Sequence, residues 1–233
     1  MSLGTLNIVA TPIGNLEDIT LRALRILKEV DFVLSEDTRV TRKLLDHYQI
    51  GTPMISYHQH SGEIKAAKIL ELLNEGKNLA LVTDAGTPGI SDPGGNLVSL
   101  VRAELGDEIS IVSIPGPSAL TAGISIAGSG FDRFLFLGFL PHKKGRQKML
   151  KEIMASEHSV AVYESKHRIV KFLKELEDIC RELGTDRRVM VAREITKMHE
   201  SFYQGTAAEV SKELSDNPNF LKGEFLVLIQ KIK

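Results

Sequence analysis

The regular alternation of short apolar runs with helical patterns in the first half of the chain limits its fold more than any other feature. Runs that are apolar throughout are typical of strands buried on both faces, and strands separated by helices favour a parallel sheet. The first half is therefore predicted to be a doubly wound α/β domain with a mostly parallel sheet. Its predicted strands are 6–10, 32–34, 54–57, 79–82 and 109–114, and its predicted helices are 18–30, 38–48, 62–75 and 94–105.

The pattern changes after Pro115-Gly116-Pro117-Ser118. Ser118 is a suitable cap for a helix of small residues, and Gly128-Ser129-Gly130 is predicted to be a hinge between domains. The runs at 189–195 and 200–205 are close enough to form a hairpin, so we expect a mixed sheet here. The chain is thus predicted to hold two α/β domains, residues 1–116 and 117–233. Further predicted strands are 134–140, 160–163 and 225–229, and the predicted helices are 145–156, 166–183 and 206–215.

The composition is that of a soluble intracellular protein. With 233 residues and 42% hydrophobic content, the chain can bury two cores of modest size. The single cysteine excludes an intramolecular disulfide, and neither a leader nor an apolar run of about 20 residues is present. We therefore expect a cytoplasmic protein outside the membrane. The histidines show no spacing that builds a zinc site, so no metal is expected.

Charge is unevenly distributed along the chain. Residues 1–125 carry a net charge of −5 and residues 126–233 one of +4, although the whole chain carries only −1. This split is compatible with a basic second half that meets a polyanion, but it falls short of a dedicated nucleic-acid binder.

The most specialised loop follows the apolar run at 79–82. Residues 80–95 include four glycines, two prolines and two aspartates. The backbone of such a loop can approach a ligand closely, while Asp84 and Asp92 offer fixed acceptors. Ligands of open α/β sheets bind at this end of the strands. For Asp92, which precedes a proline, ordinary turn chemistry is the alternative.

The loop after the first predicted strand excludes two common nucleotide sites. It reads Ala10-Thr11-Pro12-Ile13-Gly14-Asn15-Leu16 and lacks the G-x-G-x-x-G fingerprint of dinucleotide-binding proteins. No P-loop motif occurs elsewhere in the chain. Residues 11–18 are predicted either to form a turn that ends in a helix cap at Asp18 or to contact the substrate.

Several motifs, taken together, resemble one known family. They are residues 10–16, Ser35-Glu36-Asp37-Thr38-Arg39, residues 83–94 and Pro115-Gly116-Pro117-Ser118-Ala119, followed by residues 138–141, 163–168 and 192–197. In this order they are similar to the bacterial 16S ribosomal RNA methyltransferase I family of the tetrapyrrole methylase superfamily. The resemblance covers nearly the whole chain.

The resemblance implies an S-adenosyl-L-methionine-dependent enzyme that methylates the 2′-hydroxyl of a cytidine in the decoding region of 16S rRNA, in the small ribosomal subunit. It also implies a homodimer and a cofactor cleft between the two domains. Carried over to this sequence, it gives a set of cofactor-binding candidates from both domains. These are Pro12, Gly14, Asp84, Ala85, Gly86, Thr87, Ser118, Ala119, Tyr163 and Ala192.

A ribose hydroxyl is too weakly acidic to attack unaided, so a base or a cation is expected near it. We predict the catalytic candidates Glu36, Asp37, Arg39 and Lys197, the first three at the end of the second predicted strand. The alternative for this segment is structural: Asp37 or Thr38 caps the next helix, and Arg39 forms a surface ion pair. The sequence does not rank the possible bases, which also include Glu164, Lys166 and Glu194.

The stretch His142-Lys143-Lys144-Gly145-Arg146-Gln147-Lys148 is a predicted site of phosphate contact, with surface solvation as the alternative. Since the chain lacks tryptophan, base stacking would fall to Tyr57, His58, Phe139 or Tyr163, all of which are more often core residues. Two other functions stay open at this point. One is methylation of a tetrapyrrole or a protein side chain, and the other is a non-catalytic ribosome-assembly factor that binds RNA.

Overall fold

A computed structural model describes residues 2–58, 62–92, 94–216 and 218–231, so Pro93 of the loop motif lies outside the described residues. The chain divides into two compact units, Met1–Ser118 and Ala119–Lys233. This division falls two residues after the boundary expected at residue 116.

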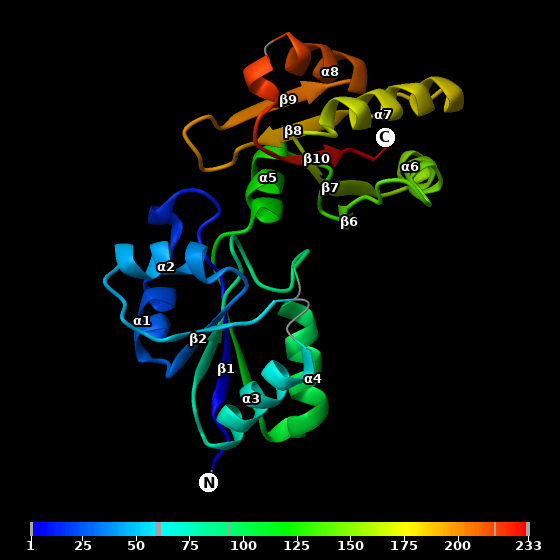
Figure 1. Ribbon diagram of the computed structural model, residues 1–233. Coiled ribbons are helices and arrows are strands. Elements are labelled where there is room, and N and C mark those ends of the chain that lie inside the picture. Colours follow the sequence, from blue (N-terminus) through cyan, green and yellow to red (C-terminus); the bar gives the residue numbers. More distant parts are fainter. Residues whose placement is uncertain (1, 59–61, 93, 217, 232–233) are drawn as a thin grey trace. The chain divides into compact units, whose positions relative to one another are not determined.

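The first unit contains a five-stranded sheet in the order β3-β2-β4-β1-β5, in which every pairing is parallel. The prediction of a doubly wound parallel sheet is confirmed (Figure 1). Its strands are β1 (Thr5–Val9), β2 (Phe32–Ser35), β3 (Met54–Ser56), β4 (Leu79–Leu81) and β5 (Ser110–Ile114), and its helices are α1 (Leu21–Glu29), α2 (Thr38–His47), α3 (Gly62–Asn74) and α4 (Gly94–Leu105).

Both faces of this sheet are covered, which explains why its strands are apolar throughout. In β4, Leu79 and Leu81 pack with residues of α3 and α4, whereas Ala80 and the following Val82 pack with residues of α1 and α2. Successive side chains of a strand point to opposite faces, so an uninterrupted apolar run serves two cores at once.

Helix α1 begins later than the sequence indicated. Thr20 is its cap, because the Thr20 hydroxyl accepts a hydrogen bond from the backbone N–H of Ala23 at 3.0 Å. Asp18 instead ends the short 3₁₀ helix η1 (Leu16–Asp18), which Asn15 caps. The alternative of a helix cap at Asp18 is therefore wrong, because Asn15 caps η1 and Thr20 caps α1.

The second unit contains a five-stranded mixed sheet in the order β6-β7-β10-β8-β9. Only β6 and β7 are parallel, and the predicted hairpin is the antiparallel pair β8 and β9. The strands are β6 (Phe134–Phe139), β7 (Ser159–Ser165), β8 (Val189–Arg193), β9 (Ser201–Gly205) and β10 (Glu224–Ile229), and the helices are α5 (Ala119–Ala127), α6 (Arg146–Ala155), α7 (Ile169–Leu183) and α8 (Ala207–Ser215).

Helix α5 covers one face of this mixed sheet, and α6, α7 and α8 cover the other. A glycine lets α5 approach the sheet closely: a Cβ added to Gly123 would lie 2.2 Å from Cδ2 of Leu226 on β10. The helix begins directly after Ser118, as expected.

The predicted hinge at Gly128-Ser129-Gly130 is wrong. The side chain of Gln230 donates to the carbonyl of Ser129 at 2.9 Å, and the hydroxyl of Ser159 donates to the carbonyl of Gly130. The segment is thus fixed to the ends of β7 and β10 inside the second unit, because its backbone carbonyls find partners there.

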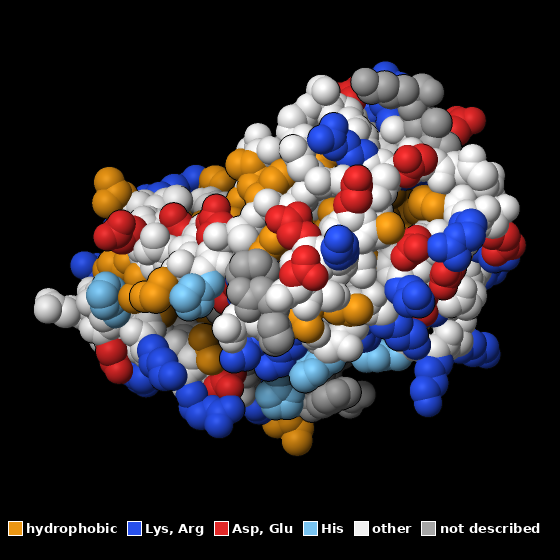
Figure 2. Space-filling model, turned by 90° about the horizontal axis from the view of Figure 1, so that it is seen from above, with side chains coloured by type: hydrophobic (Ala, Val, Ile, Leu, Met, Phe, Trp, Pro, Cys, Tyr) orange, Lys and Arg blue, Asp and Glu red, His pale blue; other side chains and the backbone are white. Residues whose placement is uncertain are grey.

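Among the described residues, no helix is long and apolar enough to cross a membrane. On the face shown in Figure 2, acidic and basic side chains are interspersed, with hydrophobic side chains between them. Any attraction of this face for a polyanion therefore depends on local groups of cations rather than on a broad basic field.

Candidate functional site

The carboxyl edge of the parallel sheet contains a topological switch point. β1 and β4 are neighbours, but the chain leaves β1 toward α1 on one face and leaves β4 toward α4 on the other. In open α/β sheets, the crevice at such a point is where ligands bind. The loops after β1 and β4 carry two of the predicted motifs, so the fold brings them to the expected position.

These two loops are hydrogen-bonded to each other. The backbone N–H of Thr11 donates to the carbonyl of Gly86 at 2.9 Å, and the N–H of Gly86 donates back to Thr11 at 3.1 Å. The Thr11 hydroxyl also donates to the carbonyl of Thr83 at 3.0 Å. Gly86 has a φ of +83°, a conformation that a side chain rarely adopts. The pairing fixes the loop that holds Asp84, Ala85 and Gly86.

The loop after β5 joins the same edge. The Thr87 hydroxyl donates to the carbonyl of Pro117 at 3.2 Å, next to Ser118 and Ala119. A Cβ added to Gly116 would lie 3.0 Å from Cβ of Ala10, so a side chain here would press against the loop after β1. In the β1 loop, Pro12 is buried and Gly14 is exposed. All predicted cofactor contacts of the first unit therefore belong to three connected loops.

Acidic side chains gather at this edge. The backbone N–H of Asp37, after β2, donates to the Asp84 carboxylate at 3.2 Å. Burial raises the pKa of Glu36, and the charges of Asp84 and Asp92 raise it further. His58 acts in the opposite direction. Glu36 is therefore a carboxyl group whose proton affinity is tuned upward by its surroundings, as is common in catalytic acids and bases.

Asp37 and Arg39 adopt the structural alternative. The Asp37 carboxylate caps α2 by accepting from the backbone N–H of Arg39 at 2.8 Å, and it pairs with the Arg39 guanidinium at 2.6 Å. The hydrogen bonds from the Arg39 side chain and backbone lower the pKa of Asp37 to about 2. The Arg39 side chain is 86% exposed. Asp37 is thus a poor proton acceptor at neutral pH.

Asp92 braces its own loop. Its carboxylate accepts from the backbone N–H of Gly89 at 2.9 Å and from that of Gly94 at 2.7 Å. These contacts are the turn chemistry that the sequence left as the alternative, and they place Gly94 at the start of α4.

In the second unit, Tyr163 and Ala192 flank the same residue. Leu226 of β10 pairs with Tyr163 on one side and with Ala192 on the other. Burial raises the pKa of Tyr163, against the effect of a hydrogen bond from the backbone of Leu120 in α5. Ala192 is 1% exposed and lies among apolar side chains under α5. Within this unit, Ala192 therefore packs in the core.

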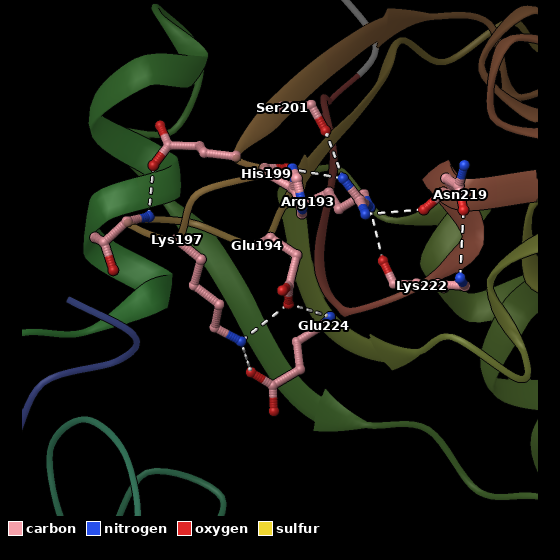
Figure 3. Close-up of polar contacts among 10 residues, drawn as sticks. Arg193, Glu194, Lys197, His199, Ser201, Asn219, Lys222 and Glu224 are labelled. Atoms are coloured by element: carbon pink, nitrogen blue, oxygen red, sulfur yellow. Dashed lines mark hydrogen bonds and ion pairs between the residues drawn. The ribbon is translucent and has the colours of Figure 1, made fainter. Parts of the chain in front are cut away.

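Lys197 lies in a small ionic cluster after β8. Its ammonium contacts Glu194 at 2.9 Å and Glu224 at 2.8 Å (Figure 3). Burial lowers the pKa of Lys197, but the hydrogen bonds with Glu224 and Glu194 outweigh this effect, so the net shift is upward. Lys197 is therefore a cation at neutral pH, which makes it unsuited to act as a base.

Sequence reasoning missed the residue that shapes this loop. Arg193 is 5% exposed, and its guanidinium donates to the carbonyls of Lys222, His199 and Asn219 at 2.7 to 3.0 Å. Figure 3 shows these bonds joining the loop after β8 to the segment before β10. The only signal in the sequence was the motif 192–197, which does not show that an arginine is buried.

The predicted phosphate site at residues 142–148 is wrong for Arg146. Its side chain is buried and contacts Glu175 at 2.7 Å, with Glu164 at 3.7 Å. The buried carboxylate of Glu164 pairs in addition with Arg168 at 2.7 Å. Arg146 is thus a structural residue, and the engaged Glu164 is not an available base. Lys143, Lys144 and Lys148 are exposed.

No group of three or more His, Cys, Asp or Glu side chains in the described part of the chain is placed to hold a metal ion. The candidate site is an edge of loops that carries several carboxylates. Such an edge suits an organic ligand with amino and hydroxyl groups, because carboxylates accept hydrogen bonds from both.

Comparison with known proteins gives matches along most of the chain. The family model described as Tetrapyrrole (Corrin/Porphyrin) Methylases matches residues 5–211. A protein of Synechocystis sp. named Ribosomal RNA small subunit methyltransferase I is 45% identical over 97% of this chain and 79% of its own length. One of the same name from Thermotoga maritima is 47% identical over 89% of this chain and 90% of its own length.

Solved structures show the same fold at low sequence identity. The methyltransferase CobJ matches with a TM-score of 0.69 and 19% identity, over 98% of this chain and 94% of its own. The uroporphyrin-III C-methyl transferase of Thermus thermophilus, in complex with S-adenyl homocysteine, matches with a TM-score of 0.64 and 20% identity, over 97% of both chains. The two-sheet architecture is therefore shared with these two solved structures.

Proposed function

Because this chain belongs to the tetrapyrrole methylases, and within them to the ribosomal RNA small subunit methyltransferase I family, we propose that it methylates 16S rRNA of the small ribosomal subunit. The methyl donor is S-adenosyl-L-methionine, and the acceptor is the 2′-hydroxyl of a cytidine in the decoding region. The structural observation that carries this proposal is the convergence of the loops after β1, β2, β4 and β5 on one sheet edge.

The residues at this edge fit the cofactor. S-adenosyl-L-methionine has one sulfonium, one ammonium and one carboxylate, so it is a cation with ribose hydroxyls that donate hydrogen bonds. Asp84 is exposed at the edge, and the negative charges of Asp84 and Asp92 lie near enough to Glu36 to raise its pKa. Gly86 and Gly116 keep the backbone free of side chains where the loops meet. We propose that Asp84, Ala85, Gly86 and Thr87 hold the cofactor, with Pro12, Gly14, Ser118 and Ala119 beside them.

When bound, the cofactor supplies an electrophilic methyl group that an oxygen nucleophile can displace from sulfur. The protein's part is to align the acceptor and to take up its proton. We assign the proton acceptor to the Glu36 carboxylate, because its pKa is raised whereas that of Asp37 is lowered to about 2. General base catalysis of this kind accelerates a reaction by roughly 10²- to 10⁴-fold.

Lys197 takes a different role in this proposal. Since Glu194 and Glu224 keep it protonated, it serves as a fixed cation that contacts the RNA. Arg39, with a side chain that is 86% exposed, is proposed to contact a phosphate. Tyr163 is proposed as a further cofactor contact, as the family resemblance implies. Ala192 contributes packing beneath α5.

The alternatives have less support. The relatives above 40% identity carry ribosomal names, whereas the tetrapyrrole enzymes match at about 20% identity. A non-catalytic assembly factor would need neither Gly86 and Gly116 where the loops meet nor a Glu36 carboxyl group with a raised pKa.

We also propose that the protein acts in the cytoplasm, where ribosomal subunits are assembled, and that it forms a homodimer. The support for a dimer is the edge strand β6, where Phe134, Leu135 and Leu137 are 36%, 43% and 37% exposed. Size-exclusion chromatography coupled to light scattering tests the homodimer. A protein that stays monomeric across the micromolar concentration range would contradict it.

The decisive experiment is transfer of a tritiated methyl group from S-adenosyl-L-methionine to small ribosomal subunits that lack the modification. We expect about one methyl group per subunit, in a nucleotide linkage that resists alkaline hydrolysis, as 2′-O-methylation requires. Label in protein or on a base would contradict the proposed acceptor. Calorimetry that detects no binding of the donor at millimolar concentration would favour the assembly factor.

A further inference from the structure

An irregularity in β6 determines where Phe139 points. β6 pairs with β7 in register as far as Phe136 and Ala161, and the next pair is Phe139 with Tyr163. Three positions of β6 thus span two positions of β7. Gly138 lies inside this bulge with a φ of +60°. Since successive side chains of a strand alternate between faces, the extra residue turns Phe139 onto the face that carries Phe136 and Tyr163.

The ring of Phe139 contacts the ring of Tyr163 and yet stays largely exposed. Its centroid lies 5.5 Å from that of Tyr163, and the Phe136 ring lies 5.1 Å from Tyr163 on the same face. Phe139 is nevertheless 55% exposed, more than any other phenylalanine or tyrosine side chain whose exposure the structure describes. The result is an aromatic side chain that contacts Tyr163 and has more than half of its surface exposed.

The turn after Phe139 is held by two arginines, Arg146, which is buried, and Arg168, which is partly buried. Arg168 donates to the carbonyl of Leu140 at 3.0 Å, and Arg146 donates to that of Pro141 at 3.2 Å. Glu164, which is 2% exposed, holds Arg168, and Glu175 holds Arg146. A network that satisfies backbone carbonyls in this way reduces the conformational freedom of the turn before any ligand binds.

Exposed cations follow this turn immediately. His142, Lys143 and Lys144 are all exposed, and in the described part of the chain neither lysine has a recorded ion pair. Their neighbour Lys148, in contrast, lies 3.8 Å from Glu152. Two ammonium groups therefore stand within a few residues of an open aromatic ring, on a turn of fixed shape.

We propose that this surface, made of Phe139, Lys143 and Lys144, binds a nucleotide of the RNA substrate. Phe139 stacks on an unpaired base, and the two lysines contact the adjoining phosphates. Protein recognition of single-stranded RNA typically combines these two contacts. The inference rests on the proposed function, because a ribose in folded RNA is reached most easily when its nucleotide is drawn out of the stack.

The test compares Phe139→Ala, Phe139→Leu and Phe139→Tyr. Each variant is assayed for binding to unmodified small ribosomal subunits, for KM and kcat at saturating donor, and for donor affinity by calorimetry. We expect Ala and Leu to weaken subunit binding by about 5- to 150-fold, the range for one stacked base. Tyr, which keeps a ring, should stay within about twofold of the wild type. Leu183→Ala is the matched control, since Leu183 is 42% exposed at the far end of α7.

Lys143→Gln with Lys144→Gln tests the phosphate contacts. The slope of log affinity against log salt should become shallower by about 0.7 for each contact to a single strand. Unchanged subunit binding in Phe139→Leu would overturn the stacking role of Phe139. Equal losses of subunit binding in Phe139→Tyr and Phe139→Ala would overturn it as well. An unchanged salt slope would overturn the role of the lysines.

These outcomes are separable from failure of the proposed function. If the wild type binds subunits but transfers no methyl group, the methyltransferase proposal fails, whereas the binding comparison still decides the role of Phe139. If donor affinity falls in Phe139→Leu as much as subunit binding does, the residue serves the cofactor and the inference is wrong.

Discussion

The backbone N–H of Asp37 donates a hydrogen bond to the carboxylate of Asp84 at 3.2 Å, although the two residues are 47 positions apart. The bond connects the loops after β2 and β4, which are neighbouring strands of the parallel sheet. It holds Asp84 beside the loop of Glu36, where the negative charge of Asp84 raises the pKa of Glu36. The proposed cofactor contact and the proposed proton acceptor are thereby joined in one arrangement.

Replacement of Asp84 by Ala is expected to weaken binding of S-adenosyl-L-methionine by about 1–3 kcal/mol, because a ligand donor loses its acceptor at a partly desolvated site. Isothermal titration calorimetry measures this change directly. Asp107→Ala is the control, since Asp107 is an exposed aspartate just before β5, at the opposite edge of the sheet. Equal affinities for wild type and Asp84→Ala would remove Asp84 from the site.

Glu36→Gln should lower kcat by roughly 10²- to 10⁴-fold while donor affinity changes little, because glutamine cannot accept the proton of the ribose hydroxyl. In the wild type, kcat should rise with pH as Glu36 ionises, and this acid limb should be absent in the variant. Asp37→Asn, which preserves the helix cap, provides the comparison. A larger loss in Asp37→Asn than in Glu36→Gln would assign the base to Asp37 instead.

Glu36→Gln should also change how stability depends on pH. The pKa of Glu36 in the folded protein is raised by burial and by Asp84 and Asp92, so ionisation of this group disfavours the folded state. The stability that protonated Glu36 contributes is fully present below about pH 4.5, the ordinary pKa of a glutamate. This stability is lost as the pH rises through the pKa of Glu36 in the folded protein. The variant should therefore gain stability relative to the wild type between pH 4 and pH 8, as followed by urea unfolding. A difference that stays constant over this range would contradict the shift.

Gly123→Ala is expected to destabilise the protein by about 1–3 kcal/mol, even though alanine favours helices. The added Cβ would lie 2.2 Å from Cδ2 of Leu226, so either the Leu226 side chain or α5 would have to move. Gly95→Ala in α4 is the matched control, because nothing lies within 4 Å of the added Cβ there. It should be stabilising by about 0.4–1 kcal/mol. Thermal unfolding of both variants separates the effect of packing at α5 from the effect of helix propensity. Equal shifts of the melting temperature in the two variants would argue against a tight contact at α5.

The sequence by itself determined the order and kind of the elements. Runs such as 79–82 are apolar at every position because both faces of their strand are covered, and this pattern is local and readable. The glycines and aspartates of residues 80–95 likewise predicted a ligand loop at a strand end, because parallel strands align their carboxyl ends at one edge.

Tertiary structure alone decided which of several similar side chains are available. Glu36 and Asp37 are adjacent in the chain, yet Arg39 lowers the pKa of one while burial and distant carboxylates raise that of the other. Arg146 belongs to a basic stretch of the sequence, yet its side chain is buried and forms an ion pair with Glu175. The partners of a polar group come from elements remote in sequence, so local patterns do not contain them. The direction of Phe139 likewise depends on one extra residue in a strand pairing, which only the register with β7 defines.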